Sequence, residues 1–355
     1  MFSWSLKGST KYLTILKREL DCIRQHKCFL KKSSGIRKIQ RPPMERNWKP
    51  PLQESSNSYR LLSYNILAQE LLTDNMFLYY DNDPKFLSWK YRIGQLGLEV
   101  NKLQPDIMCL QEVQHVHLKE MVRLFGARNS GPIKLEYSFK KRTGTRCDGC
   151  AILYDKSKFK LIEDSIIEYY DEGCSISNRE NIALMAKFAL RSDPATTFVV
   201  VTTHLLYNPR RHDVRVSQIS KLIRGIIKFS KDPTKDTHRL PVILTGDFNC
   251  TPDSTPFRML TTERRAVVPA AKEEKEEHFL LESIHFGSDC ASTFQNQWIV
   301  VDYILKSCAF GGEKTIQINS TYNLPNVISC QSYGKIPNKN YGSDHFSLAI
   351  QFSII

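Results

Sequence analysis

Two apolar runs that follow one another without an intervening helix restrict the fold of this chain most strongly. Residues 182–190 and 197–203 both have the apolar, β-branched character of strands, and only six residues separate them. A connection this short joins antiparallel strands, because a parallel pair needs a crossover of a dozen or more residues. A purely parallel, doubly wound sheet is therefore excluded, and a mixed α/β architecture is expected.

The rest of the chain alternates short apolar runs with amphipathic ones. These patterns predict strands at 60–66, 106–111, 241–244, 299–305 and 346–352, and helices at 89–103, 117–125 and 214–229. Two packed sheets with helices on their outer faces fit this order of elements.

A proline- and serine-rich stretch divides the chain. Pro42-Pro43, Pro50-Pro51 and residues 55–58 have the composition of a linker. We therefore expect residues 1–58 to form a flexible basic arm with its linker, and residues 59–355 to form one catalytic domain.

Charge is distributed unevenly between these two parts. Residues 1–50 hold 13 Lys and Arg against three acidic residues, a net of +10 out of +13 for the whole chain, so the remaining residues carry only +3. The arm can attract phosphate groups without sequence preference, or it can be a solvated tail. Any basic groove in the body must be local.

Composition also bears on location. No apolar run approaches the roughly 20 residues that span a bilayer, and the first segment lacks the apolar core of a secretory signal. The ten cysteines are scattered singly, which suits a reducing compartment. We expect a cytoplasmic protein without membrane attachment, with mitochondrial targeting by the basic N-terminal segment as the alternative.

Polar residues recur at the downstream ends of the predicted strands. They are Asn65, Gln111-Glu112, Thr203-His204, Asp247-Phe248-Asn249 and Asp344-His345, the last pair opening the final strand. Each has an ordinary structural explanation, since Asp-x-Asn is a common turn and a lone His is usually a satisfied structural residue. Together they supply carboxylates, amides and two imidazoles, an oxygen-rich set suited to a hard divalent ion and a phosphate.

Six segments in this order resemble the signature of the endonuclease/exonuclease/phosphatase superfamily. They are Ser63-Tyr64-Asn65-Ile66-Leu67, Gln111-Glu112-Val113, Thr203-His204-Leu205, Gly246-Asp247-Phe248-Asn249, Val301-Asp302-Tyr303-Ile304 and Ser343-Asp344-His345. The resemblance covers about residues 59–353. It implies the DNase I-like α/β fold, a four-layer sandwich of two mixed sheets flanked by helices, with the cleft across the top of the sheets.

Further segments are similar to the nocturnin and deadenylase group, and most closely to its Angel branch. They are Asn65-Ile66-Leu67-Ala68, Arg142-Thr143-Gly144 with Asp148-Gly149-Cys150-Ala151, and His204-Leu205-Leu206-Tyr207-Asn208-Pro209-Arg210-Arg211. No leucine-rich repeat precedes the body, so recruitment to a deadenylase complex by that route is not expected.

The resemblance implies roles for the matching residues. Glu112 is expected to bind Mg²⁺, or Mn²⁺ in its place, with help from Asn65 and from Asp344 through water. Asp247 and Asn249 are expected to activate and hold the attacking water.

On the phosphate side, His345 is expected to bind or protonate phosphoryl oxygens, with Asp302 fixing its tautomer. His204 and Asn208 are expected to contact the phosphate from the opposite side. Arg142 and Asp148, in the group's loop motif, are expected to shape the substrate pocket.

Substrate is less determined than mechanism, because one catalytic set serves several substrates in this superfamily. The prediction is a phosphodiesterase that acts on RNA 3′ ends as a 3′→5′ exoribonuclease of the deadenylase type. The alternative is hydrolysis of a terminal 2′,3′-cyclic phosphate, and an alternative of another class is a non-catalytic RNA-binding adaptor. Either enzyme needs a base to stack near the cleft, for which Tyr207, Phe248 and Trp298 are candidates.

Overall fold

The short connection between the two adjacent apolar runs does join antiparallel strands. In the computed structural model of the chain, β7 (Ile182–Leu190) pairs with β8 (Thr197–His204), and Ala183 lies opposite Thr203. The structure describes residues 42–52, 57–232, 238–261, 279–308 and 314–355. Residues 43–355 form one compact unit, whereas the basic arm at 1–41 lies outside the described residues.

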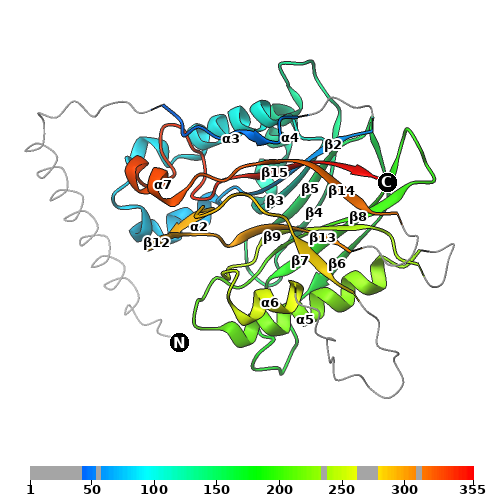
Figure 1. Ribbon diagram of the computed structural model, residues 1–355. Coiled ribbons are helices and arrows are strands. Elements are labelled where there is room, and N and C mark those ends of the chain that lie inside the picture. The colour runs from blue at the N-terminus through cyan, green and yellow to red at the C-terminus, as the bar shows by residue number, and fades with distance from the viewer. Residues whose placement is uncertain (1–41, 53–56, 233–237, 262–278, 309–313) are drawn as a thin grey trace, which may run out of the picture. The chain divides into compact units, whose positions relative to one another are not determined.

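Two mixed sheets form the centre of this unit (Figure 1). The first contains, in spatial order, β1 (Trp48–Lys49), β14 (Ile316–Tyr322), β15 (Leu348–Ile354), β2 (Tyr59–Asn65), β3 (Ile107–Gln114), β5 (Asp148–Asp155) and β4 (Leu135–Lys141). The second contains β10 (Leu281–Ser283), β13 (Asp302–Ser307), β9 (Val242–Asp247), β8, β7 and β6 (Phe159–Glu168). A small hairpin, β11 (Thr293–Gln295) with β12 (Gln297–Ile299), stands apart from both.

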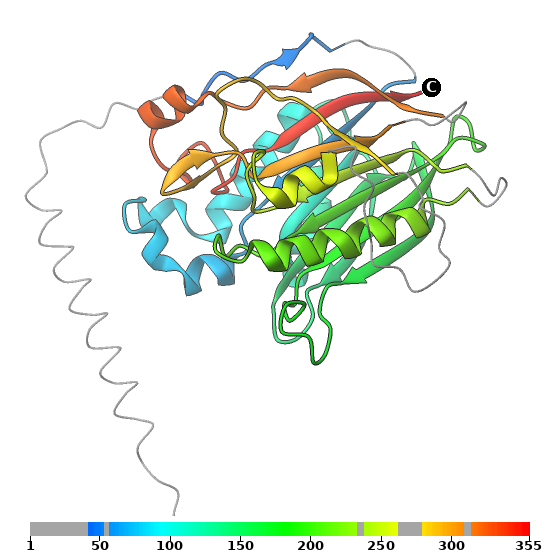
Figure 2. The ribbon, with the colours of Figure 1, turned by 60° about the horizontal axis from the view of Figure 1, so that its bottom comes forward.

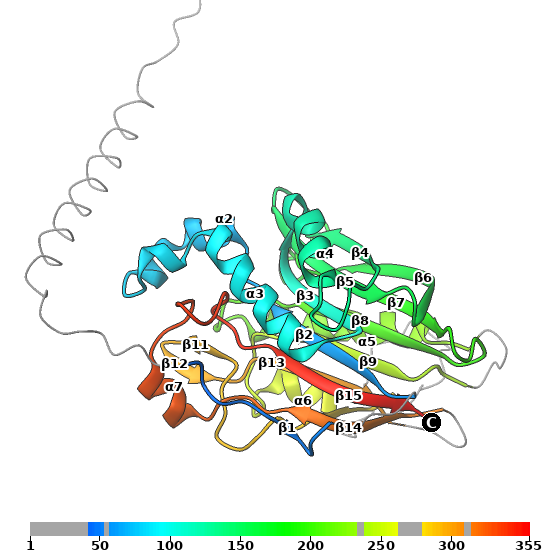
Figure 3. The same cartoon turned by 90° about the horizontal axis from the view of Figure 1, so that it is seen from above.

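Helices cover the outer faces of the two sheets. The helices α3 (Trp89–Leu103) and α4 (Leu118–Gly126) lie over the first sheet, as the view from above shows (Figure 3). The helices α5 (His212–Phe229) and α6 (Thr255–Thr261) lie over the second (Figure 2). The short helices α2 (Gln69–Asp74) and α7 (Val327–Tyr333) lie outside these layers. The predicted four-layer sandwich of two mixed sheets is confirmed.

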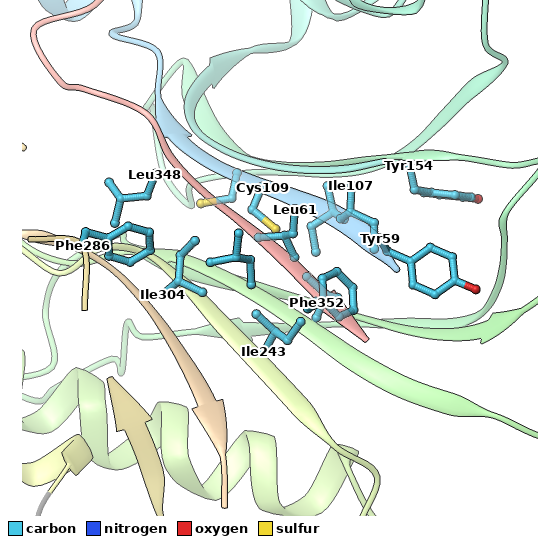
Figure 4. Packing of buried hydrophobic residues seen from close by; sticks show 14 of the residues in the cluster. Tyr59, Leu61, Ile107, Cys109, Tyr154, Ile243, Phe286, Ile304, Leu348 and Phe352 are labelled. Atoms are coloured by element: carbon cyan, nitrogen blue, oxygen red, sulfur yellow. The ribbon is translucent and has the colours of Figure 1, made fainter. Parts of the chain in front are cut away.

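The apolar core between the sheets follows from the alternation of side chains along each strand. On β2, Tyr59 and Leu61 face the second sheet, where Leu61 packs in one cluster with Ile243 and Ile304 (Figure 4). Leu62 faces the other way and packs against α3 and α4. Because successive side chains of a strand point to opposite faces, one strand serves two cores.

Two parallel strand pairs position the site. β2 runs parallel to β3, with Asn65 opposite Gln111, and β8 runs parallel to β9, with His204 opposite Asp247. The carboxyl ends of each pair therefore meet at one end of the sandwich. Below them, Gln111 Nε2 donates to Thr202 Oγ1 (2.8 Å) and joins the two sheets.

The folded unit begins earlier than the predicted start at Tyr59. β1 pairs with β14, and Arg46 is 3% exposed, with Nη1 donating to Glu99 Oε1 (3.0 Å) and Nε to Asn323 O (2.9 Å). Such a segment has too few apolar residues to show in a sequence pattern, since a buried cation and a two-residue strand hold it in place. Among the described residues, no helix is long and apolar enough to cross a membrane.

Candidate functional site

A β-bulge directs Glu112 toward Asn65 at the end of β2. The register between β3 and β5 shifts between Leu110 and Val113, and Glu112 has a φ of 57°, in the left-handed region. Non-glycine residues adopt this conformation rarely and at a cost of about 1–3 kcal/mol, which is typical of functional sites. Gly149 lies opposite Val113, where a Cβ would approach Lys140 O to 2.0 Å. Glycine is therefore required at this position by the close approach of β4, on the other side of β5 from the bulge.

The carboxylate of Glu112 is held at both oxygens. Asn65 Nδ2 donates to Oε1 (3.0 Å), and the backbone N–H of Ala68 donates to Oε2 (3.0 Å). Burial, followed by the neighbouring carboxylates Asp344 and Asp148, raises the pKa of Glu112 to about 7. Negative charge is thus concentrated around Glu112 without an equal positive charge beside it.

Asp247 ends β9 and lies at the centre of the site. Its Oδ2 accepts a hydrogen bond from Asn65 Nδ2 (3.1 Å), and it lies 3.6 Å from His204 Nε2 and 3.7 Å from His345 Nε2. Gly246 precedes it with a φ of 147°, and a Cβ there would lie 2.0 Å from Thr203 O, so the chain can reach this position only with glycine. Burial, and next the charge of Asp302, raises the pKa of Asp247 to about 6.

The two histidines beside Asp247 have different partners. His345 Nδ1 lies 2.8 Å from Asp302 Oδ2, and although burial opposes the charged form, Asp302 holds the pKa of His345 well above its usual value. The pKa of His204 is lowered, chiefly by burial, and its Nδ1 has no hydrogen-bond partner among the described residues. At neutral pH, His345 is therefore the protonated imidazole and His204 the neutral one.

Asn249 is placed by its backbone as well as by its side chain. It has a φ of 50°, its N–H donates to Asp247 Oδ1 (3.0 Å), and its Nδ2 donates to Leu205 O (3.0 Å). This Asp-x-Asn turn fixes Asp247 and is also a feature that structural need explains. The side-chain oxygen of Asn249 lies 3.4 Å from Gln295 Nε2.

Asp344 is held by a residue that the sequence pattern did not indicate. Tyr79, at the end of a 3₁₀ helix (Met76–Tyr79), donates its hydroxyl to Asp344 Oδ2 (2.7 Å). Burial and the Asp344 carboxylate raise the pKa of Tyr79, so the phenol stays protonated and remains a donor. No motif marks Tyr79; its only sequence signal is that it belongs to the aromatic run Phe77-Leu78-Tyr79-Tyr80.

The residues joined so far, Asn65, Glu112, His204, Asp247 and His345, form what is called the catalytic cluster below. Arg142 and Asp148 form a nearly buried ion pair next to it. Arg142 donates to Asp148 Oδ1 through Nε (3.1 Å) and also through Nη2. The second oxygen of Asp148 is buried without a hydrogen-bond partner. Asp148 is the first residue of strand β5, not part of a loop as the motif suggested.

Two kinds of predicted substrate contact, Asn208 and the aromatic residues, make no hydrogen bond to the cluster among the described residues. The side chain of Asn208 is exposed and accepts a hydrogen bond from the N–H of Arg210 (3.0 Å) in its own loop. Of the three aromatic candidates for base stacking, Phe248 is fully buried and Trp298 is 9% exposed, so neither can stack on a base. Tyr207 is 52% exposed, and burial together with the charges of Asp344 and Asp247 raises its pKa, which indicates a position beside the cluster.

Two groups of side chains can be considered for a metal ion. The ligand atoms of Asp247, Asp302 and His345 lie within 4.8 Å of one another, but Asp302 and His345 already balance each other's charge. Glu112 with Asp344 carries the uncompensated charge and fits a hard divalent cation better. Asn65 turns its amide nitrogen to the carboxylates while its oxygen accepts from Leu67 N (3.1 Å), so it would have to turn over to offer an oxygen.

Comparisons with known proteins agree with this geometry. The model of the Endonuclease/Exonuclease/phosphatase family matches residues 62–345. Protein angel of Drosophila melanogaster is 42% identical over 301 residues, which cover 84% of this chain and 82% of the fly protein. Protein angel homolog 2 of Danio rerio is 37% identical over 210 residues, covering 58% of this chain but only 36% of the zebrafish protein.

Solved structures give the same result. The crystal structure of ANGEL2, a 2′,3′-cyclic phosphatase, in complex with adenosine-2′,3′-vanadate matches with a TM-score of 0.73 and 25% identity, covering 88% of this chain and 99% of that one. The human Nocturnin catalytic domain matches with a TM-score of 0.63 at 21% identity, over 89% and 100% of the two chains, which shows a shared fold. The chain belongs to the endonuclease/exonuclease/phosphatase family of hydrolases, and within that family to the Angel proteins.

Proposed function

We propose that the chain hydrolyses the 2′,3′-cyclic phosphate at the 3′ end of RNA in a Mg²⁺-dependent reaction. The observation that carries the proposal is the buried Asp247 carboxylate between two imidazoles whose pKa values are shifted in opposite directions, in a fold shared with a 2′,3′-cyclic phosphatase. Neighbouring groups whose pKa values are shifted apart can act as general base and general acid in one reaction, here Asp247 and His345.

Asp247 would take the proton of the attacking water. Its pKa of about 6 lies near neutral pH, where a general base is both ionised and basic enough to act. Asn65 and Asn249 hold the two carboxylate oxygens in place. Oδ2 of Asp247 is the oxygen that faces both imidazoles, and it would accept the proton of the attacking water.

His345 would stabilise and protonate the phosphoryl side of the reaction. Its Nδ1–H donates to Asp302, which leaves Nε2–H directed to the site. As one P–O bond of the cyclic diester breaks, the released ribose oxygen needs a proton, and an imidazolium can give it. His204, neutral and 10% exposed at its side chain, would donate a hydrogen bond to a phosphoryl oxygen.

Glu112 and Asp344 would hold Mg²⁺, which supplies charge neutralisation for the phosphate when it is bound. The fit rests on the raised pKa of Glu112, which comes from burial and from the neighbouring carboxylates, because a bound cation would favour the ionised form of both acids. Tyr79 would keep Asp344 in place by its hydroxyl.

The cyclic phosphatase is favoured over the exoribonuclease by what surrounds the site. A nuclease that removes successive nucleotides benefits from several stacking surfaces, whereas a terminal cyclic phosphate needs one ribose and its base. Two of the three candidate rings are buried, which leaves Tyr207 to cover the terminal base. The adaptor alternative would predict loss of an essential group, yet the acidic, amide and imidazole groups discussed above are all present.

A product assay tests the proposal. The full chain is incubated with labelled RNAs that end in 3′-OH, 3′-phosphate or 2′,3′-cyclic phosphate, with Mg²⁺ or with EDTA. We expect one terminal conversion of the cyclic end, with Mg²⁺ only. A shortening ladder on the 3′-OH RNA would instead support the exoribonuclease, and no reaction of any end would support the adaptor.

Matched amide variants make the assay specific to the site. Asp247→Asn should abolish the conversion, while Asp193→Asn, in the turn between β7 and β8 at the opposite end of the second sheet, should not change it. Equal activity of Asp247→Asn and the unmodified chain would refute the mechanism.

A further inference from the structure

Three loops that surround His204 carry an excess of positive charge that the catalytic cluster does not use. They are residues 142–147 between β4 and β5, residues 177–181 before β7, and residues 205–211 after β8. Together they hold five basic residues and one acidic residue, Glu180, a net of +4. Arg142 and Arg211 are paired with acidic residues just outside the loops, Asp148 and Asp213, so the charge left over comes from Arg146, Arg179 and Arg210.

Strand directions place the three loops at the site. β5 begins at Asp148, opposite Gln114 at the end of β3, and β7 begins at Ile182, next to the end of β8 at His204. The loops also contact one another: Thr143 N donates to Glu180 O (3.2 Å), and Asn181 Nδ2 donates to His204 O (3.0 Å). They form a continuous rim beside the cluster.

A buried arginine fixes the third of these loops. Arg215 on α5 donates to three backbone carbonyls of the loop, those of Leu206 (2.9 Å), Asn208 (2.7 Å) and Pro209 (3.0 Å). Arg215 is 1% exposed, so its charge is used inside the loop and not at the surface. The loop therefore presents Arg210 from a fixed backbone.

The outward basic side chains of the rim have few partners. Arg179 and Arg210 make no ion pair with the described residues, and Arg146 pairs with Glu180 (2.7 Å), an exposed pair that stabilises little. Unpaired arginines beside the catalytic cluster are typical of a surface that meets a polyanion.

We propose that this rim binds the phosphodiester backbone of the RNA upstream of the terminal cyclic phosphate, through Arg146, Arg179 and Arg210. The inference rests on the proposed function and adds to it the residues that bind the RNA beyond its terminal nucleotide. The contacts are with phosphates, so they supply affinity without sequence preference and weaken as salt rises.

The test compares two substrates that share the same reacting group. One is adenosine 2′,3′-cyclic phosphate, and the other is an RNA of about 15 nucleotides with a 2′,3′-cyclic end, long enough to cross the rim. For a variant with Arg146→Glu, Arg179→Glu and Arg210→Glu, we expect KM for the RNA to rise roughly tenfold or more, with kcat and the kinetics on the mononucleotide unchanged. The matched control is Lys160→Glu, on β6 at the far end of the second sheet, which should change neither substrate.

Three outcomes would overturn the proposal. They are an unchanged KM for the RNA, an equal loss on both substrates, and an unmodified chain that hydrolyses both substrates with the same kcat/KM. If the glutamate variant does not fold, judged by its thermal unfolding, the corresponding three glutamine substitutions replace it.

Binding separates failure of this inference from failure of the proposed function. If the unmodified chain hydrolyses neither substrate, the affinity for RNA ending in 3′-OH is measured as a function of salt. We then expect the slope of log Kd against log salt to decrease by about 0.7 for each phosphate contact removed in the variant. An unchanged slope would reject the rim whatever the reaction is.

Discussion

His345 and His204 lie on opposite sides of one carboxylate, at nearly equal distances, yet their environments act in opposite directions. His345 Nε2 and His204 Nε2 are 3.7 Å and 3.6 Å from Asp247 Oδ2. His345 Nδ1 lies 2.8 Å from a second carboxylate, Asp302, whereas the Nδ1 of His204 has no hydrogen-bond partner among the described residues and lies 4.0 Å from Glu112 Oε1. The comparison shows that the distance to a shared base does not decide the role of an imidazole. The partner of the other ring nitrogen, Nδ1, decides it.

Removal of the shared carboxylate has the largest expected effect. Asp247→Asn keeps the shape of the side chain but removes the base between the two imidazoles, so we expect kcat to fall by about 10³-fold or more. The measurement is single-turnover conversion of an RNA with a 2′,3′-cyclic end. A loss of less than about tenfold would mean that neither histidine works with Asp247.

The second prediction makes His345 resemble His204. Asp302→Asn removes the partner that raises the pKa of His345, so the imidazolium is lost at lower pH. If His345 acts while protonated, activity falls as pH rises through its pKa, and this basic limb should move to lower pH in the variant, with a loss of about 10²-fold at neutral pH. The pH–rate profile checks it, and an unmoved basic limb would contradict the assignment.

His204→Asn should have a smaller effect. An amide replaces a neutral imidazole and can still donate a hydrogen bond, so we expect about a tenfold loss of kcat. The basic limb of the pH–rate profile should stay where it is in the unmodified chain. A shift of that limb as large as the one expected for Asp302→Asn would mean that the two imidazoles titrate as one unit.

The pH dependence of the free energy of unfolding should show that Glu112 is buried near other carboxylates. The folded protein holds the pKa of Glu112 at about 7, above its ordinary value of 4.5, so folding takes up protons between these values. This contribution is present below about pH 4.5 and is lost as pH rises through about 7, in the absence of metal. Bound Mg²⁺ favours the ionised form, so its effect on Tm should grow over the same pH range.

The measurement for this last prediction is thermal unfolding with Mg²⁺ or EDTA, at pH values below and above 7. Glu112→Gln cannot ionise and should lose most of the Mg²⁺ effect while it gains stability in EDTA. Its matched control, Glu163→Gln on β6, removes an exposed carboxylate and should keep the full effect. An Mg²⁺ effect that does not depend on pH would place the ion elsewhere.

Much of the fold and of the site was predictable from sequence because apolar runs and strand ends are local features. α3 and β7 begin and end where the pattern placed them, and the positions of Asn65, Glu112, His204 and Asp247 followed from strand ends. The order of these segments also indicated that they belong to one site.

Other features depend on contacts between distant segments. β6 loses the alternation of apolar and polar residues at the register shift between Leu161 and Glu163, and β5 begins inside a Gly-containing motif, so neither has a clear strand pattern. Tyr79 acts through one polar contact to Asp344, 265 positions away, and Arg46 through contacts to Glu99, Asn323 and Ser347. Periodicity carries no information about such contacts.

The charge states of the two imidazoles give the most direct test of the account. Nitrogen-15 NMR of the histidine rings, in protein freed of divalent metal by EDTA, reports the protonation of each ring nitrogen, and the variants His204→Asn and His345→Asn assign the signals. At neutral pH we expect both nitrogens of His345 to carry protons and His204 to be neutral. Two rings that titrate together near the ordinary pKa of histidine, or a charged His204 beside a neutral His345, would contradict it.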